Sequence, residues 1–414
     1  MKSSPALAVL LYGQHIATIY QNKNGRHDLE YEPDPGATPL SLSMPLEQQH
    51  HGHRIVNAFI TGLVPDDRVV RAGLGRQFDV SGENPYALLE HTGLDCAGAV
   101  QFCRPDEVEP TLTRPGELHP VDDQAIAARL KELRRTPSAT WTLPRERWSL
   151  GGYQPKIALH KVGDHWAEAT GSAPTTHIIK PGVHDLRQSA LNEHLCLSTA
   201  RRLDLPASET CFQEFAGEPA VVITRYDRTQ SGTAAVGRLH QEDLCQALGI
   251  PPTRKYEEQG GPSALTILDL LARTDPGAQL RFIEYLGFNY LIGAPDCHAK
   301  NFSLLLVGTT VRLAPLYDVA SGLPYEGRID PTFAFALRGQ RSFGTLSDEN
   351  WSWLAKRAGL DDELVLQIVH DLAARIPDAL RDSFAAAESI PGTSELAARM
   401  LTPVAKLCAR SGRK

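Results

Sequence analysis

The spacing of apolar residues changes along this chain of 414 residues, and this change most constrains the fold. Up to about residue 226, short apolar runs such as ALAVLLYG, KIALHKV, THIIK and PAVVITRYD alternate with Gly, Pro and Asn, which is typical of strands and turns. From about residue 240, apolar residues recur at helical spacing, except in FSLLLV and VRLAPLYDV. The sequence predicts an α+β fold with two lobes, the first β-rich and the second mainly helical, and a ligand cleft between them.

Three segments are expected along the chain. Residues 1–105 form a β-rich subdomain, residues 106–226 complete the first lobe, and residues 227–414 form the helical lobe. Helices are predicted near 57–63, 122–135 and 188–203, where apolar residues share one face.

Composition indicates an ordinary globular protein, with 42% hydrophobic and 22% charged residues and a net charge of −7. The chain as a whole is therefore not expected to bind polyanions. Seven scattered cysteines without a CxxC pair predict neither a disulfide framework nor a cysteine-ligated zinc site. Polar residues interrupt the apolar N-terminal stretch at YGQH, so we expect a cytoplasmic protein without a membrane span.

The stretch APDCHAKNF concentrates polar side chains in one turn. Asp296 and Asn301 have the D-x-x-x-x-N spacing that phosphoryl transfer uses to supply a base and a metal ligand from one loop. Lys300 could neutralise charge on the transferring group, and His298 is expected to orient the turn.

Asp318 lies at the end of the run VRLAPLYDV. Two strands that run out and back would bring it beside Asn301, and the two side chains would supply oxygen ligands to Mg²⁺. Taken alone, an Asp at a strand end is more often a turn former or a helix cap.

Upstream segments supply further candidate residues. In SLGGYQPK, Gly151 and Gly152 precede a strand and could let backbone N–H groups approach phosphates, although a hairpin turn with a solvated Lys156 is the plainer interpretation. Lys180 ends the strand of THIIK, where an ammonium could bind phosphate, and Glu193 on the next helix could pair with it or lie on the surface.

The strand of PAVVITRYD ends in three residues placed where a linker could bind an adenine edge: Thr224, Arg225 and Tyr226. Any edge strand could show the same pattern. The order of the parts is more informative than any one of them, because a protein kinase also arranges a Gly-rich turn, a strand lysine, a linker, a base-plus-Asn loop and a metal aspartate in this order.

At these residues the sequence resembles the HipA family of serine/threonine kinase toxins. The matching segments are SLGGYQPK, THIIKPG, RLHQEDLCQALG, KYEEQGGP, DCHAKNFSLL, PLYDVAS and the N-terminal NAFITGLVPDD. The resemblance spans nearly the whole chain, and it implies a kinase-like fold and an ATP- and Mg²⁺-dependent protein kinase that is the toxin of a toxin–antitoxin pair.

The resemblance also implies site residues. It makes Asp296 the catalytic base, Asn301 and Asp318 the metal ligands, and Ser149 an autophosphorylated serine whose added charge would expel the loop and silence the enzyme. The residues that it implies at the nucleotide are Gly151, Gly152, Tyr153, Gln154, Pro155, Lys156, Lys180, Thr224, Arg225, Tyr226, His298, Ala299, Lys300, Asn301, Tyr317 and Asp318.

Partners are implied in the same way. Family members pair with a small helix-turn-helix antitoxin similar to HipB, the complex binds operator DNA, and the substrate associated with the family is glutamyl-tRNA synthetase. Two other functions remain open. One is a metal-dependent hydrolase that uses Asp296, His298 and Asp318, and the other is a catalytically inactive scaffold for the antitoxin and DNA.

Overall fold

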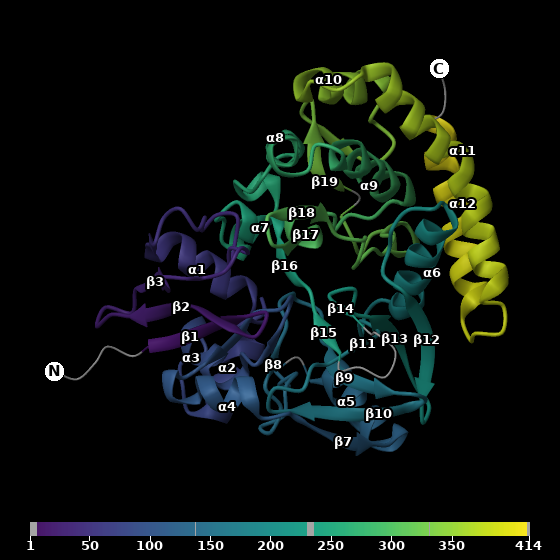
Figure 1. Cartoon of the computed structure of the whole chain (residues 1–414). Coiled ribbons are helices and arrows are strands. Elements are labelled where there is room, and N and C mark those ends of the chain that lie inside the picture. The colour runs from purple at the N-terminus through teal and green to yellow at the C-terminus, as the bar shows by residue number, and fades with distance from the viewer. Residues whose placement is uncertain (1–5, 137, 230–235, 331, 412–414) are drawn as a thin grey trace. The chain divides into compact units, whose positions relative to one another are not determined.

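The computed structural model describes residues 6–136, 138–229, 236–330 and 332–411 (Figure 1). It divides into two compact units, each assembled from separate stretches of chain. The β-rich unit comprises the described residues within 1–181, 214–253 and 304–311, and the helical unit those within 182–213, 254–303 and 312–414. The segment boundaries expected at residues 105 and 226 stay a prediction.

The β-rich unit begins with a five-stranded antiparallel sheet in the order β4-β3-β2-β1-β6. Its strands are β1 (Ala6–Leu11), β2 (Gln14–Gln21), β3 (His27–Tyr31), β4 (His50–His51) and β6 (Gln101–Cys103). Buried side chains of the sheet, including Leu7, Ile19 and Leu29, form one core with Phe59 of α1 (His53–Gly62) and Leu88 of α3 (Pro85–Thr92).

A second sheet of six strands has the order β12-β13-β11-β9-β10-β7. These strands are β7 (Glu117–Val121), β9 (Ile157–Val162), β10 (His165–Thr170), β11 (His177–Pro181), β12 (Thr210–Phe215) and β13 (Glu218–Thr224). Helix α5 (Asp123–Arg135) buries Ile126, Leu130 and Leu133 in the core of this sheet. The strands predicted from KIALHKV, THIIK and PAVVITRYD and the helix predicted near 122–135 are therefore confirmed.

The first hundred residues contain helices that the sequence did not predict. The helices α2 (Arg68–Phe78) and α3 lie in a region predicted as strands and hairpins. Two glycines inside α2 weaken the helical signal, since glycine has a low helix propensity. Packing explains one of them: a Cβ on Gly75 would lie 2.6 Å from the carbonyl oxygen of Val80. The close approach of the following turn therefore requires glycine there.

Several short elements complete this part of the chain. Strands β5 (Asp95–Cys96) and β8 (Trp148–Ser149) pair in parallel, whereas β14 (Arg228–Thr229) and β15 (Gly237–Arg238) pair antiparallel. A three-stranded sheet contains β16 (His240–Asp243), β17 (Ser303–Val307) and β18 (Thr310–Leu313). The short helices are α4 (Val108–Thr113) and α7 (Leu244–Ala247).

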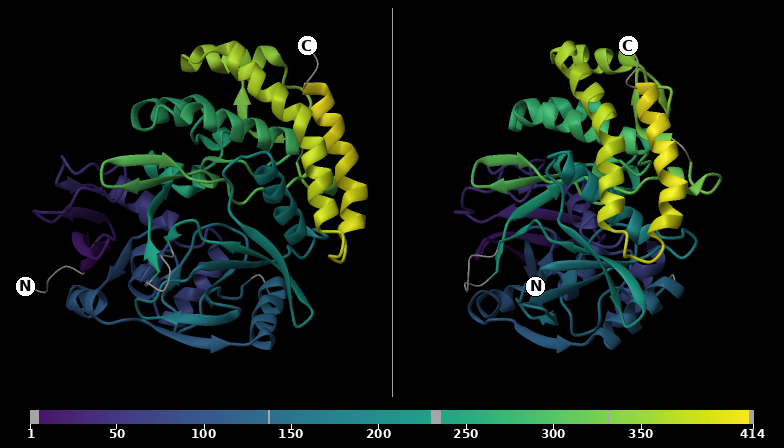
Figure 2. Two further views of the ribbon diagram at one scale, coloured as in Figure 1. Left: turned by 45° about the vertical axis from the view of Figure 1, so that its right-hand side comes forward. Right: turned by 90° about the vertical axis from the view of Figure 1, so that its right-hand side faces the viewer.

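The helical unit is organised around α11 (Asp362–Ala386), which packs against α6, α9, α10 and α12. Figures 1 and 2 show α11 and α12 side by side. The other elements of the unit are α6 (Ser189–Arg202), α8 (Ala264–Thr274), α9 (Ala278–Ile292), α10 (Asp348–Ala358), α12 (Thr393–Ser411) and the hairpin of β19 (Thr332–Leu337) and β20 (Gln340–Ser342). No helix in the described ranges combines the length and apolarity needed to cross a membrane.

Candidate active site

The polar turn 294–302 belongs to the helical unit and connects the buried helix α9 to strand β17. Gly293 ends α9 in a left-handed conformation with φ +72°, and a Cβ at this position would lie 2.5 Å from Leu323. Glycine therefore lets the chain leave the helix abruptly here. A short 3₁₀ turn, Ala299–Asn301, then leads into the strand. The turn is thus held at both ends by regular structure.

Within the turn, Asp296 is accessible and Asn301 is fixed. The Asp296 side chain is 61% exposed, whereas Asn301 is buried and its Nδ2 donates a 2.6 Å hydrogen bond to the carbonyl oxygen of Asp296. This bond closes the turn, and it leaves the Oδ1 oxygen of Asn301 as the atom suited to a cation. The D-x-x-x-x-N spacing therefore brings the two predicted residues together.

His298 is buried beneath this turn, with Nε2 3.4 Å from Oδ1 of Asp296. Burial lowers the pKa of His298 to about 4, so the ring is neutral near physiological pH. Neither ring nitrogen has an aligned hydrogen-bond partner among the described residues. A neutral, enclosed ring fits the expectation that His298 orients the turn.

The out-and-back course of β17 and β18 returns the chain to the same place. The Tyr317 hydroxyl donates a 2.8 Å hydrogen bond to the carbonyl oxygen of Lys300 and lies 2.7 Å from the hydroxyl of Ser303. Asp318 follows with φ +56°, a left-handed conformation that is uncommon outside glycine and is often found at functional sites. Tyr317 therefore contacts the turn, and the approach of Asp318 to Asn301 stays a prediction.

Electrostatics also place the two carboxylates in one neighbourhood. The charges of Asp296 and of Asp318 both raise the pKa values of Tyr256 and His298, although burial has the largest effect on each pKa. Asn301 and Asp318 offer the oxygen ligands that Mg²⁺ prefers, so the residues present fit this ion. Among the described residues, no group of three or more His, Cys, Asp and Glu side chains could hold a metal ion. A magnesium ion here would therefore need further oxygen ligands, as a nucleotide supplies.

The glycine-rich loop lies in the β-rich unit, between β8 and β9. Gly152 has φ +100°, and a Cβ on it would lie 2.8 Å from Nζ of Lys156. The Lys156 side chain is buried, donates a 2.9 Å hydrogen bond to the carbonyl oxygen of Gly151, and stands 4.4 Å above the ring of Trp141. Lys156 therefore stabilises this conformation of the loop. The alternative prediction of a solvated lysine in a hairpin turn is wrong.

The rest of this loop differs in exposure. Tyr153 is 67% exposed, and Gln154 donates from Nε2 to the carbonyl oxygen of Pro181 at 3.4 Å. This contact places the loop beside the end of β11, which carries Lys180. Ser149 is buried, and its hydroxyl donates a 2.9 Å hydrogen bond to the carbonyl oxygen of Leu63.

The predicted adenine-binding stretch begins beside β11, since Thr224 pairs with His177 and Val221 pairs with Lys180. Lys180 lies near the end of this strand, as predicted from THIIK, and its side chain is buried. Tyr226 donates from its hydroxyl to the side chain of Gln241. The stretch thus has a fixed backbone.

Arg225 belongs to a buried ion-pair cluster. Its guanidinium contacts Asp227 at 2.8 Å and Asp95 at 3.3 Å, and its backbone N–H donates to the carbonyl oxygen of Thr176. Arg228 and Arg238 also pair with Asp95. The side chain of Arg225 is therefore committed to the protein interior, which the sequence alone did not indicate.

One residue without a predicted role contacts the polar turn 294–302. Tyr256 donates a hydrogen bond from its hydroxyl to Oδ1 of Asp296, and its ring meets His298 edge-on at a centroid distance of 4.7 Å. Tyr256 lies within KYEEQGGP, a segment that contributed to the family resemblance without suggesting a function.

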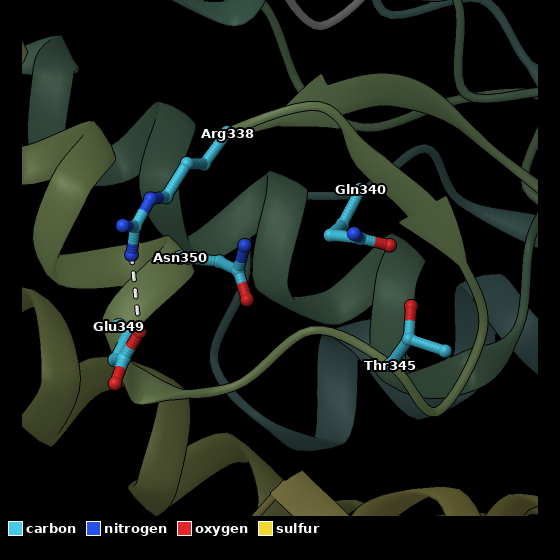
Figure 3. A pocket seen from close by; sticks show the side chains of 5 residues that line it. All are labelled: Arg338, Gln340, Thr345, Glu349 and Asn350. Carbon is cyan, nitrogen blue, oxygen red and sulfur yellow. Dashed lines mark hydrogen bonds and ion pairs between the residues drawn. The ribbon is translucent and has the colours of Figure 1, made fainter.

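A polar hollow of about 440 Å³ opens elsewhere in the helical unit (Figure 3). Arg338 and Glu349 pair across it at 3.0 Å, and Asn350 donates to the carbonyl oxygen of Leu337. Its lining residues are Arg338, Gln340, Thr345, Glu349 and Asn350. None of the predicted site residues lines it.

Two family models match the chain. The HipA N-terminal domain matches residues 7–103, and the HipA-like C-terminal domain matches residues 148–380. The second match alone covers more than half of the sequence.

Individual proteins are also similar to this chain in sequence or in structure. A Sinorhizobium fredii protein, Y4mE, whose name describes it as a kinase, is 31% identical over 89% of each chain. The serine/threonine-protein kinase toxin HipA of Shewanella oneidensis is 26% identical over 83% of this chain and 80% of its own. A solved complex of HipA, HipB and operator DNA from Shewanella oneidensis contains a chain similar in structure, with a TM-score of 0.86, 24% identity, and coverage of 98% of this chain and 97% of that one. This likeness confirms the predicted two-lobed, kinase-like α+β fold.

Proposed function

The chain belongs to the HipA family, and from this premise we propose that it is an ATP- and Mg²⁺-dependent serine/threonine protein kinase and the toxin of a toxin–antitoxin pair. The observation that carries the proposal is the turn that exposes Asp296 while it fixes Asn301 five residues later. This arrangement provides a base and a ligand oxygen from one loop, which is what phosphoryl transfer requires.

In the proposed reaction, Asp296 accepts the proton of an acceptor hydroxyl. The hydroxyl oxygen forms a bond to the γ-phosphorus of ATP, the bond from that phosphorus to the β–γ bridging oxygen breaks, and ADP leaves. Asn301 and Asp318 would hold Mg²⁺, which when bound would neutralise phosphate charge. His298 stays neutral and keeps the turn in place, and Lys300 adds positive charge beside it.

Roles in the β-rich unit rest on sequence order and on the local geometry described above. Lys180 would pair with phosphate oxygens, and the backbone of residues 151–156 would line the phosphates. Thr224 and Tyr226 would contact the adenine. For Arg225 the carbonyl oxygen is the suitable group, because its N–H and its guanidinium already have protein partners. The carbonyl oxygen accepts from the N–H of Arg228 at 3.3 Å, and it has a second lone pair for a ligand.

Ser149 is the proposed autophosphorylation site. Its hydroxyl is buried and donates a hydrogen bond to the carbonyl oxygen of Leu63. The segment around Ser149 must therefore leave this position before the hydroxyl can accept a phosphate. The phosphate would add a charge of about −1.5 to −2, which could not return to a buried site without a partner. Modification is therefore expected to hold the glycine-rich loop open and lower activity.

The proposed partners are a HipB-like helix-turn-helix antitoxin and, through it, operator DNA. The solved relative was crystallised in such a complex. The net charge of −7 agrees with DNA contact made mainly by the partner. A cytoplasmic protein substrate such as glutamyl-tRNA synthetase is the finer proposal, which phosphorylation of the purified synthetase would test.

Mass spectrometry of the purified chain, with and without ATP and Mg²⁺, tests the reaction and the base together. We expect phosphate on Ser149 in the parent and in an Asp382→Asn control, because Asp382 is exposed on α11. We expect none in Asp296→Gln. A parent that never transfers phosphate to itself or to a protein acceptor would overturn the proposal.

The two alternatives are less well supported. A hydrolase would need Asp296, His298 and Asp318 to bind one ion, and the described residues contain no such group of three. An inactive scaffold gives no reason for an exposed Asp296 beside a fixed Asn301. If Asp296→Gln were as toxic to cells as the parent, the scaffold would become the better explanation.

A further inference from the structure

The segment KYEEQGGP, residues 255–262, forms a tight turn that contacts the catalytic loop within the helical unit. A short 3₁₀ turn, Glu257–Gln259, follows Tyr256, and Gly261 donates from its N–H to the carbonyl oxygen of Tyr256 at 3.0 Å. A Cβ on Gly261 would lie 2.2 Å from the carbonyl oxygen of Arg254. Glycine is therefore required for the chain to turn back here.

The turn directs the hydroxyl of Tyr256 to Oδ1 of Asp296. From this contact we propose that Tyr256 is a positioning residue, which fixes the Asp296 carboxylate so that Oδ2 faces the acceptor hydroxyl. The inference rests on the proposed kinase function and adds a residue to it. Tyr256 itself is not proposed to touch the substrate.

Asp296 needs such a partner because its side chain is 61% exposed and follows a proline at the tip of a loop. The hydrogen bond from Asn301 fixes its backbone carbonyl and does not reach the carboxylate. His298 approaches Oδ1 at 3.4 Å without an aligned hydrogen bond. The bond from Tyr256 therefore restricts a carboxylate that would otherwise rotate in solvent, and misplacement by about 1 Å can cost about 100-fold in rate.

Tyr256 remains able to donate this bond over the working pH range. Burial, followed by the charge of Asp296, raises the pKa of its phenol well above the ordinary value. The edge-on contact with His298 restrains the ring as well. A protonated, restrained phenol is what a fixed donor requires.

The segment is anchored on two sides. Glu257 accepts a 2.8 Å hydrogen bond from the N–H of Ala336 in β19, and Glu258 pairs with Arg341 of β20 at 2.5 Å. On the other side, the carbonyl oxygen of Lys255 accepts from the N–H of Ala299 at 3.3 Å. The hairpin and the catalytic turn therefore hold Tyr256 between them.

Steady-state kinetics of Tyr256→Phe test the inference, with protein phosphorylation as the readout. We expect kcat to fall about 10- to 100-fold while KM for ATP stays within about twofold. The temperature of thermal unfolding should match that of the parent, so that a loss of folding does not account for the lower kcat.

Tyr285→Phe is the matched control, because the Tyr285 hydroxyl lies in the same unit but donates to the carbonyl oxygens of Pro206 and Ala314 instead of a carboxylate. It should keep the parental kcat. An active parent together with an unchanged kcat in Tyr256→Phe would overturn the role of Tyr256 alone. An inactive parent would overturn the proposed function, and this inference with it.

Discussion

The turn 294–302 and the cluster around Asp95 both contain charged side chains, yet they differ in how completely those charges are paired. In the cluster, Asp95 accepts hydrogen bonds from Thr175, Arg225, Arg228 and Arg238, and it is buried. In the turn, Asp296 is mostly exposed and receives a hydrogen bond from Tyr256 on one oxygen. The first arrangement has no capacity left for a ligand, and the second keeps an oxygen available.

This difference separates a charge that stabilises the fold from the charge that we propose to act in catalysis. Burial alone would raise the pKa of Asp95, but three guanidinium groups together outweigh it and hold the pKa below the usual range. Asp95 is therefore a permanent anion that holds separate segments together. Asp296 is accessible enough to exchange a proton, which a base requires.

The largest expected effect is a loss of activity on substitution of Asp296. Asp296→Asn should lower kcat about 10²- to 10⁴-fold, because the amide cannot accept the proton of the acceptor hydroxyl. Thermal stability should be close to that of the parent, since the side chain is exposed. Radiolabel transfer from ATP measures the rate, and Asp382→Asn is the control. A variant that retained half of the parental rate would show that another group is the base.

The second effect concerns stability. Asp95→Asn should lower the free energy of unfolding by about 3–5 kcal/mol, because three guanidinium groups lose this buried anionic partner. Arg225 and Arg228 then share Asp227. Hydrogen exchange should rise in peptides around residues 95–103 and 225–229. Asp164→Asn, at an exposed turn of the same unit, should leave the exchange unchanged. Parental protection in Asp95→Asn would contradict the view that the cluster holds these segments.

The third effect concerns Glu242, a buried carboxyl group that has no ion pair among the described residues. Glu242 accepts hydrogen bonds from Ser41 at 2.5 Å and from the N–H of Leu42 at 2.8 Å, and burial raises its pKa to about 8 from an ordinary 4.5. Between pH 4.5 and 8 the folded protein keeps a proton that the unfolded chain has lost. Its contribution to stability is therefore present at low pH and is lost as the pH rises.

Glu242→Gln removes this titration while its amide can still bond to Ser41 and Leu42. The free energy of unfolding of the variant, relative to the parent, should rise between pH 5 and pH 8, by at most about 1.4 kcal/mol per pH unit. Denaturation curves at several pH values measure the slope, with the exposed Glu30→Gln as control. If the free energy of unfolding depended on pH equally in the parent and in Glu242→Gln, the raised pKa of Glu242 would be contradicted.

Local patterns predicted much of the fold. The strands β9, β11 and β13 and the helix α6 follow apolar runs of the expected spacing, and Lys180 lies at the end of its strand as predicted. Two glycines concealed the helix α2, because glycine has a low helix propensity. One of them, Gly75, is required by the close packing of a later turn. The sequence could not show this contact.

The sequence alone determined two features: the spacing of Asp296 and Asn301, and the strand pair that returns the chain to Tyr317. Residues close together in the chain, within one turn and one hairpin, determine both features. The tertiary structure decided the rest. Arg225 meets Asp95 across 130 positions of chain, and Tyr256 meets Asp296 across 40. Pairing over such separations depends on how the elements pack, and no local pattern of residues encodes it.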